Sequence, residues 1–252
     1  DSIERDFSPK SNRFDRPKLT FPNSDDVEWV IPPLSLQPHF RVLEVAAGTG
    51  ELSRAIAPVV RQVTLFDRDR TQLEWGLKIA RKTGMTNLSA RRGFAESLPY
   101  ADNTFDVVVT RLGFHHFKRP EIVLAQMKRV CRTGGKIVVI DRVAPGNSAW
   151  AREYDRLETL RDPSHVRAVP LYEIKQLFRE AGLSIVRTES RDVPIDFPTW
   201  IDRKVTPPEL EYKFYVELKR DIDGESVTGM RPFWQGDRLF FLQIVAMTIG
   251  RK

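Results

Sequence analysis

From residue 41 onward, short apolar segments alternate with segments in which apolar residues recur every three or four positions. The first kind predicts β-strands and the second predicts amphipathic helices. Strands are expected at 41–47, 62–67, 88–93, 105–111 and 136–144, and helices at 51–60, 69–84 and 120–131. Segments such as DVVVT and KIVVI are apolar on both faces, which is typical of parallel strands covered by helices on each side. The pattern therefore predicts a doubly wound α/β sheet that is mostly parallel.

The pattern changes after Pro145. Helices are expected at 148–162, 171–182, 196–204 and 207–222, and extended strands at 183–193 and 238–252, which brings the predicted Rossmann-like sheet to seven strands. Because no crossover helix directly precedes the last strand, we expect it to be antiparallel to its neighbour. Four regions follow: an N-terminal lid (1–40), a ligand-binding core (41–145), a helical cap with a sheet extension (146–235) and a C-terminal strand of the core sheet (236–252).

Length and composition favour one globular α/β domain with a cap, since the chain has 252 residues, 41% of them hydrophobic. The 40 basic and 34 acidic residues give a net charge of +6, but the two signs are interleaved, so we expect no nucleic-acid partner. A single cysteine, Cys131, excludes an intrachain disulfide and a cysteine-rich metal site, and we expect no metal.

The N-terminal segment is charged and lacks the apolar centre of a signal peptide. The longest apolar run, LFFLQIVAMTIG, is too short to span a bilayer. We therefore expect a cytoplasmic protein without a membrane span. No pattern in the sequence indicates its oligomeric state.

The segment VLEVAAGTGELS, residues 42–53, runs from a predicted strand through a glycine turn into a predicted helix. Glycines at such a turn let the backbone approach a ligand, and the amides at the helix start favour a phosphate or carboxylate. A Walker-type phosphate loop requires Gly-Lys-Ser/Thr, whereas Gly50 is followed by Glu-Leu, which excludes it. A dinucleotide turn would not have Ser53, but Asp67 could be its acidic partner, so spacing leaves that alternative open.

Further segments occur in the same order as in one large enzyme family. Besides VLEVAAGTG, they are LFD ending at Asp67, GFAESLPYADNTFDVVVTRLGFHHF at 93–117, RVCRTGGKIVVIDRVAP at 129–145 and LRDPSHVRAVPLYEIKQLFREAGL at 160–183. This ordered set resembles class I S-adenosylmethionine-dependent methyltransferases, in the methyltransferase type 11 group that includes the quinone-biosynthesis C-methyltransferases. Glu44 inside the first strand and the GFHHF segment favour this family over a nicotinamide-binding protein.

The resemblance implies S-adenosyl-L-methionine as the cofactor and assigns the residues that bind it. Glu44 would accept from the methionyl ammonium, directly or through water, and Asp67 would bind both ribose hydroxyls. The remaining cofactor-binding positions are Ala46, Gly48 and Gly50 in the turn, Arg68 beside Asp67, Phe94 and Ala95 at the adenine, and Arg111, whose carbonyl would hold the methionine end.

Two of these positions depart from the family's pattern. Ala46 replaces a glycine, which is tolerated where φ stays negative. Phe94 replaces an acid that accepts from the adenine amino group. We therefore expect adenine to be held by packing and by backbone groups, including the amide of Ala95.

Candidate bases are polar residues near the carboxyl ends of the predicted strands, where open α/β sheets bind ligands. His115 and His116 follow the fourth strand, and Asp141 ends the fifth. Each has a structural alternative, namely a packed or loop-anchoring histidine and, for Asp141, a turn cap. Candidate acceptor-binding residues are Phe14 in the lid, His116, Tyr154, and His165 and Arg167 in DPSHVR.

Methyl transfer from a sulfonium is an in-line displacement that needs alignment and, for some acceptors, a base. The Asn/Asp-Pro-Pro-Tyr/Phe motif of nucleic-acid amino-methyltransferases is absent after the fourth strand. We therefore predict an enzyme of secondary or cofactor metabolism that methylates O, N, S or C of a small organic acceptor. Two alternatives remain open: an RNA methyltransferase, suggested by the basic net charge, and a methyltransferase fold that binds the cofactor without transferring methyl.

Overall fold

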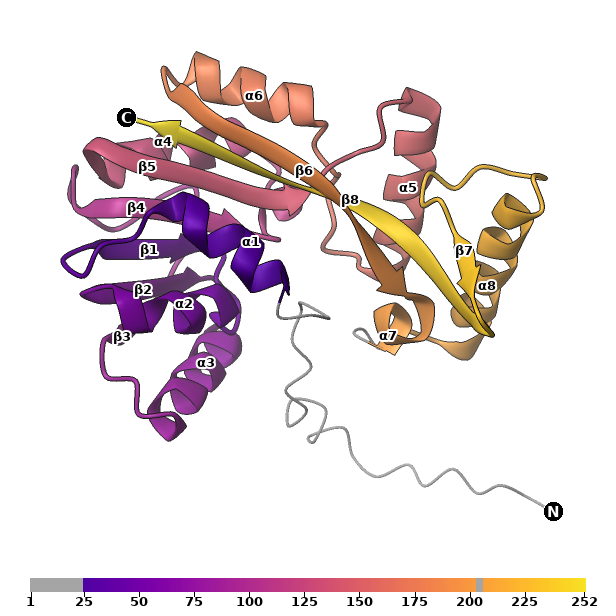
Figure 1. Ribbon diagram of the computed structural model, residues 1–252, viewed down its shortest axis with the longest axis horizontal. Helices are drawn as coiled ribbons and strands as arrows, with labels where there is room; N and C mark the ends of the chain where they lie inside the picture. Colours follow the sequence, from indigo (N-terminus) through magenta and orange to yellow (C-terminus); the bar gives the residue numbers. More distant parts are fainter. Residues whose placement is uncertain (1–24, 203–205) are drawn as a thin grey trace.

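The computed structural model describes residues 25–202 and 206–252. Within these ranges an eight-stranded sheet has the order β3-β2-β1-β4-β5-β8-β6, with β7 paired to β8 (Figure 1). The strands are β1 (Arg41–Val45), β2 (Gln62–Asp67), β3 (Leu88–Arg92), β4 (Phe105–Arg111), β5 (Cys131–Arg142), β6 (Ser184–Asp196), β7 (Phe233–Gln235) and β8 (Arg238–Arg251). β1 to β5 pair in parallel, whereas β8 is antiparallel to β5, β6 and β7. The predicted fold class, a mostly parallel sheet with an antiparallel C-terminal strand, is thus confirmed, and the short β7 is an eighth strand that the sequence pattern did not predict.

Helices cover both faces of this sheet. They are α1 (Asp25–Leu34), α2 (Glu51–Ile56), α3 (Arg70–Lys82), α4 (Pro120–Val130), α5 (Ser148–Arg161), α6 (Leu171–Glu180), α7 (Phe197–Asp202) and α8 (Pro208–Ile222), with short 3-10 turns η2 (Ala57–Val59) and η3 (Phe114–His116). Phe178 of α6 shares a buried cluster with Val108 of β4, and Leu52 of α2 shares another with the adjacent Val107. Successive strand residues therefore face opposite helix layers. In the described ranges, every helix is too short or too polar to cross a membrane.

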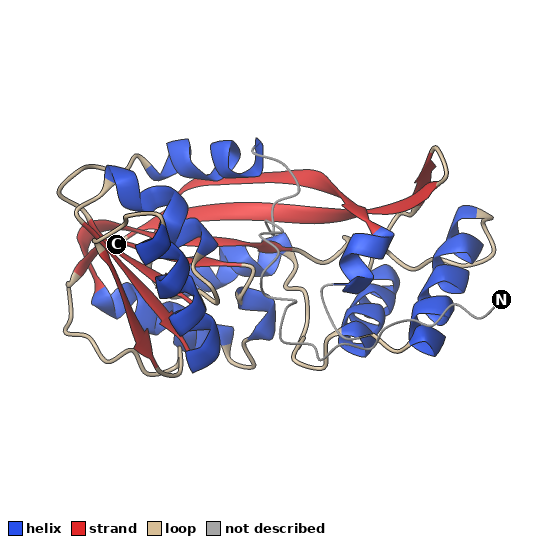
Figure 2. Ribbon diagram, turned by 90° about the horizontal axis from the view of Figure 1, so that it is seen from below, coloured by secondary structure: helices blue, strands red, loops and turns tan. Residues whose placement is uncertain are grey.

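The strands β6 and β8 extend beyond the core. Their far halves lie beside α7, α8 and β7, apart from the helices of the core (Figures 1 and 2). There a third buried cluster includes Trp200 of α7, Phe241 of β8 and Tyr154 of α5. The other half of β8 contributes Met247 to the core. One strand therefore belongs to the hydrophobic interiors of both the cap and the core.

The fifth strand begins earlier than the sequence predicts. Its start was expected at residue 136, whereas β5 begins at Cys131. Cys131 pairs with Phe105, and after an irregularity Lys136 pairs with Val107. Gly134 has a φ of 76° in this segment, the left-handed conformation found in the glycine type of β-bulge. The polar RTGG segment is therefore part of the strand.

The variant Phe241→Ala tests the packing of the cap. Phe241 is fully buried, and its ring centre lies 5.2 Å from that of Trp200. We expect its truncation to lower the free energy of unfolding by about 3–5 kcal/mol, because a cavity remains among aromatic side chains. The matched control is Phe240→Ala, since Phe240 points to the opposite face of β8 and is only half-buried. Urea unfolding, monitored by circular dichroism, measures the free energy of unfolding of both variants. Equal losses of stability in the two would contradict the described packing.

Candidate active site

A cavity of about 290 Å³ opens where the loops after β1, β2, β3 and β4 meet. This is the edge at which open α/β sheets bind ligands. One residue of the segment after α5, Ser164, also lines it. The residues predicted to bind cofactor or acceptor that line this cavity are Ala46, Gly48, Asp67, Arg68, Phe94, Ala95 and His116.

The turn after β1 forms one wall of the cavity. Gly48 has a φ of 54°, and a Cβ placed on it would lie 2.8 Å from Oε1 of Gln72, so a side chain would crowd this wall. The expectation of a negative φ at Ala46 is wrong, because its φ is 55°. The left-handed conformation costs about 1 kcal/mol for a residue with a Cβ. Space for this methyl comes from Gly113, where a Cβ would lie 2.7 Å from that of Ala46.

Asp67, at the end of β2, directs its carboxylate toward the same turn. Its Oδ2 accepts from the backbone N–H of Gly48 at 2.8 Å, and its Oδ1 accepts from that of Asp69 at 2.8 Å. The first turn of α3 is capped by Asp69, which accepts from the N–H groups of Thr71 and Gln72. Asp67 is therefore not needed as the helix cap, and each of its oxygens retains a further lone pair.

The loop after β3 carries Phe94, Ala95 and Glu96 along the cavity. Phe94 is 67% exposed, so its ring is a surface wall of the cavity and not part of the hydrophobic core. Glu96 places a carboxylate on this loop two residues beyond Phe94. The loop thus presents both an aromatic face and an acid.

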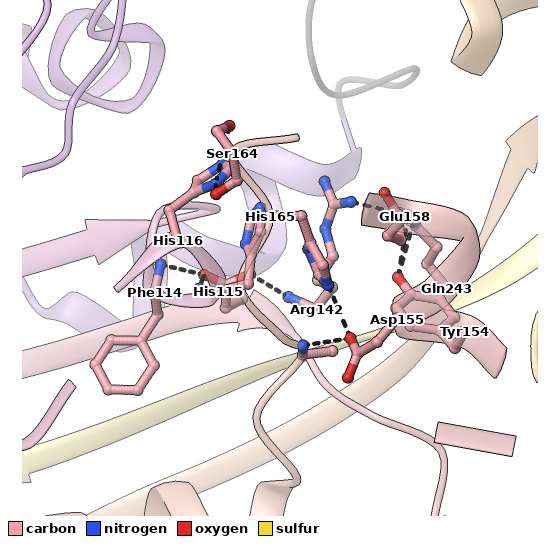
Figure 3. A network of polar contacts seen from close by, with 12 residues as sticks. Phe114, His115, His116, Arg142, Tyr154, Asp155, Glu158, Ser164, His165 and Gln243 are labelled. Carbon is pink, nitrogen blue, oxygen red and sulfur yellow. Dashed lines mark hydrogen bonds and ion pairs between the residues drawn. The ribbon is translucent and has the colours of Figure 1, made fainter. Parts of the chain in front are cut away.

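His116 is the one candidate base that lines the cavity. Its Nδ1 lies 2.8 Å from the carbonyl oxygen of Ser164 (Figure 3). A carbonyl can only accept, so Nδ1 carries the proton and Nε2 of the neutral ring is the acceptor. Burial lowers the pKa of His116 below its usual value, and the ring is therefore neutral at pH 7.

His115 and Asp141 form a buried pair behind this wall. Nδ1 of His115 lies 2.7 Å from Oδ1 of Asp141, whose Oδ2 also accepts from the N–H of Phe114 at 2.5 Å. Burial lowers the pKa of His115 to about 4. The carbonyl of His115 accepts from the N–H groups of Val166 and Arg167. This pair therefore anchors the loop after β4 and the cap segment, and it does not line the cavity.

The predicted acceptor-binding residues of the cap do not line the cavity, and each contacts another side chain instead. Tyr154 is buried and contacts Glu158, and His165 contacts Asp155 through Nε2 at 2.8 Å (Figure 3). Arg167 forms a two-pronged ion pair with Glu173. The remaining candidate, Phe14, lies outside the described residues.

Comparisons with known proteins agree with this geometry. The methyltransferase domain family matches residues 43–139. An uncharacterized methyltransferase of Bacillus subtilis, YcgJ, is 29% identical over 220 residues, which are 87% of each chain. Its crystal structure superimposes with a TM-score of 0.82 at 26% identity, covering 91% of this chain and 99% of YcgJ.

Two further relatives are similar. An uncharacterized protein of Escherichia coli, YafE, is 31% identical over 188 residues, which are 74% of this chain and 88% of YafE. The ubiquinone/menaquinone biosynthesis C-methyltransferase UbiE of Ectopseudomonas mendocina is 36% identical over 124 residues, 48% of each chain. The chain belongs to the class I S-adenosylmethionine-dependent methyltransferases.

The cavity of this methyltransferase fits its cofactor, S-adenosylmethionine. A half-buried carboxylate at Asp67 suits a diol, and the loop at 94–96 suits an adenine ring. The buried carboxylate of Glu44 lies beneath the glycine turn, where it accepts from the N–H of Ser53 at 2.9 Å and from its Oγ at 2.5 Å. Burial raises the pKa of Glu44 to about 7, and a ligand ammonium nearby would favour its charged form.

Arg111 and Gly50 support the turn from behind the cavity wall. The Arg111 guanidinium is buried and pairs with Glu51 at 3.0 Å. Gly50 precedes α2 with a φ of 69°, and a Cβ on it would overlap the side chain of Leu65. A backbone role of Arg111 toward the cofactor stays a prediction.

Several residues of the cavity wall were not predicted from the sequence, namely Phe66, Asp69, Gln72, Gly93, Glu96, Leu112, Gly113, Phe117 and Ser164. Glu96 lies in the quoted AES segment and Ser164 in DPSHVR, so the motifs contained both residues. Which members of a motif face the ligand depends on turns that the pattern does not specify. In the described ranges, no group of three or more His, Cys, Asp and Glu side chains could hold a metal ion.

The variant Glu44→Gln tests the burial of this carboxyl. Its pKa is about 7 in the folded protein and near 4.5 when unfolded, so its stabilising contribution is complete below pH 4.5 and is lost as pH rises through 7. The neutral amide can still accept from Ser53. We expect the variant to raise the free energy of unfolding by roughly 1–3 kcal/mol above pH 7 and to change it little below 4.5.

Chemical denaturation of the cofactor-free protein across this pH range measures the effect. Glu121→Gln is the control, because it makes the same change at a carboxylate that is 54% exposed on α4. A Glu44 variant that is equally destabilised at both ends of the range would contradict the assignment.

Proposed function

We propose that this methyltransferase transfers a methyl group from S-adenosylmethionine to O, N, S or C of a small organic acceptor by in-line displacement. The observation that supports this most strongly is that one cavity includes the glycine turn, the acid after β2 and an imidazole after β4. The cofactor supplies an electrophilic methyl group on a sulfonium. The chain then has to align the acceptor and exclude water, and the cap residue Ser164 in the wall is consistent with an enclosed acceptor.

The ribose and adenine sites follow from the side chains in the wall. Asp67 accepts from both ribose hydroxyls with its remaining lone pairs, and Phe94 packs against the adenine ring. Glu96 takes the role of the acid that is missing at position 94, and its carboxylate accepts from the adenine amino group. The adenine is therefore recognised by the same loop, through an acid two positions later.

The RNA methyltransferase alternative has little support from the charged side chains. Several surface arginines are paired with acids, among them Arg129 with Asp102, Arg156 with Glu217 and Arg231 with Asp192. Such pairs leave less free positive charge for phosphate groups. A cytoplasmic location and the absence of a nucleic-acid partner are kept as predictions.

The variant Asp67→Asn tests the ribose site. Replacing one acceptor oxygen by an amide removes a charge-assisted hydrogen bond to the diol, and we expect affinity for S-adenosylhomocysteine to fall about 10- to 100-fold. Isothermal titration calorimetry measures the affinity. The control is Asp237→Asn, because Asp237 is exposed in the turn between β7 and β8. Unchanged affinity in the Asp67 variant would show that the ribose binds elsewhere.

A second measurement tests Glu96 with a matched pair of ligands. S-inosylhomocysteine has an oxygen in place of the adenine amino group, so a carboxylate cannot accept from it. We expect the parent protein to prefer the adenosyl ligand by about tenfold or more, and Glu96→Gln to lose most of this preference, since an amide can donate. The control is Glu121→Gln. A preference that survives in the Glu96 variant would assign adenine recognition to the backbone alone.

Turnover decides between methyl transfer and cofactor binding without transfer. Incubation with S-adenosylmethionine and a panel of hydroxyl, amine, thiol and carbon acceptors should give acceptor-dependent S-adenosylhomocysteine. Tight binding of S-adenosylmethionine with no product from any acceptor class would favour the alternative in which the protein binds the cofactor without transferring methyl.

A further inference from the structure

The charged residues of the cavity wall are concentrated at one end. Asp67 ends β2, and Arg68, Asp69 and Glu96 belong to the loops after β2 and β3. The loop after β4 contributes Leu112, Gly113, His116 and Phe117, and the cap contributes Ser164. The imidazole is therefore the ionisable group at this end, among otherwise uncharged side chains. Such walls suit an uncharged acceptor, because a carboxylate or phosphate would be desolvated there without a cation.

The imidazole of His116 is fixed in one tautomer. The Ser164 carbonyl accepts a hydrogen bond from the protonated Nδ1 at 2.8 Å, so Nε2 keeps a free lone pair. This is the arrangement that a general base requires, since the second nitrogen of a catalytic histidine is held by an acceptor.

Ser164 is itself held by Asp162 through its hydroxyl and its backbone N–H. The Ser164 Oγ donates to Oδ1 of Asp162 at 2.6 Å, and the Ser164 N–H donates to the same oxygen at 3.1 Å. Asp162 is 7% exposed and follows α5, with its N–H bonded to the carbonyl of Glu158 at 2.8 Å. Its negative charge near the ring also favours the imidazolium that a base becomes.

We propose that Nε2 of His116 takes the proton of an uncharged acceptor that bears a weakly acidic O–H group, a phenol or an enol, with Ser164 and Asp162 as its positioning residues. The acceptor oxygen bonds to the methyl carbon, the carbon–sulfur bond breaks with its electron pair left on sulfur, and the O–H proton passes to Nε2. The net products are a methyl ether, a neutral thioether and an imidazolium, which later releases its proton to water. This assignment rests on the proposed methyl transfer and narrows it to one acceptor class.

Several charged or titratable groups face this ring. Asp141 and Arg142 of β5 and Asp162 after α5 act on its charge, and the ring of His115 lies 4.0 Å from it, centre to centre. The ring of His165 lies 5.4 Å from that of His115, centre to centre. The pKa of His116 is lowered, chiefly by burial and also by Arg142, although the Ser164 carbonyl and the two aspartates act to raise it. Because the base must be unprotonated, kcat/KM should fall on acidification, with a midpoint below the usual histidine value of about 6.5.

The test compares two phenols that differ in acidity. The first has a pKa of about 10 and is un-ionised near neutral pH. The second is a dinitrophenol, whose two nitro groups make it acidic enough to be fully ionised there. For His116→Gln we expect about a 100-fold or greater loss of kcat/KM with the first phenol and less than about a threefold change with the second, which needs no base. His39→Gln, which changes the exposed histidine after α1, is the control.

Unchanged S-adenosylhomocysteine affinity shows that the His116 variant is folded. Equal losses with both phenols, or no loss with either, would overturn the role of the base. Transfer by the parent protein to thiols or amines but to no phenol or enol would overturn the acceptor class and leave the proposed function standing. No transfer to any acceptor would contradict the proposed function itself.

The positioning residues have their own readout. Asp162→Asn removes a charge that favours the imidazolium, so the acidic limb of the kcat/KM profile should move to lower pH by about half a unit or more. Ser164→Ala keeps the carbonyl but loses the Oγ contact, and it should lower kcat with little change in KM. A merely structural role would lower activity at every pH without moving the limb, and that result would overturn the assignment of Asp162.

Discussion

One buried carboxylate, Asp141 at the end of β5, holds the loop on which the active site depends. It is 1% exposed and accepts from the N–H of Phe114 and from the ring of His115. Burial opposes its charge, but the His115 ring and the backbone donors hold the pKa of Asp141 below its usual range. In the same loop, the carbonyl of His115 accepts a hydrogen bond from the N–H of Arg167. The loop that carries His116 and the cap segment beside it are thereby fixed to the sheet.

A second buried group of charges joins the cap to the core. Glu158 of α5 pairs with Arg142 of β5 at 3.0 Å and with Arg161 at 2.8 Å, and it accepts from Gln243 of β8 at 2.7 Å. Although burial opposes its charge, these partners hold the pKa of Glu158 at about 2. Buried ion pairs add little net stability, but removing one partner is costly. The group therefore fixes the orientation of the cap more than it increases stability.

The fold could be predicted because its determinants are local and periodic. The parallel strands are continuous apolar runs, and open α/β sheets bind ligands where strands end. Asp67 and His116, which the sequence places at those ends, both line the cavity, and their roles stay predictions. The partners of a side chain are distant in sequence and could not be predicted. Tyr154 lies in the predicted helix 148–162 and His165 in the quoted segment 160–183, yet their contacts with other residues direct them away from the cavity. The strained φ of Ala46 depends on the space at Gly113, which no local pattern contains.

The position of β8 has a consequence for how the chain folds. This strand follows β5 and β6 in sequence but lies between them in the sheet. During synthesis, both neighbours must emerge from the ribosome before the strand that joins them, so their edges have no partner for that interval. Completion of the core and of the cap is then a single late event, with many contacts between distant parts of the chain and slow folding. A chaperone that shields strand edges would act in that interval.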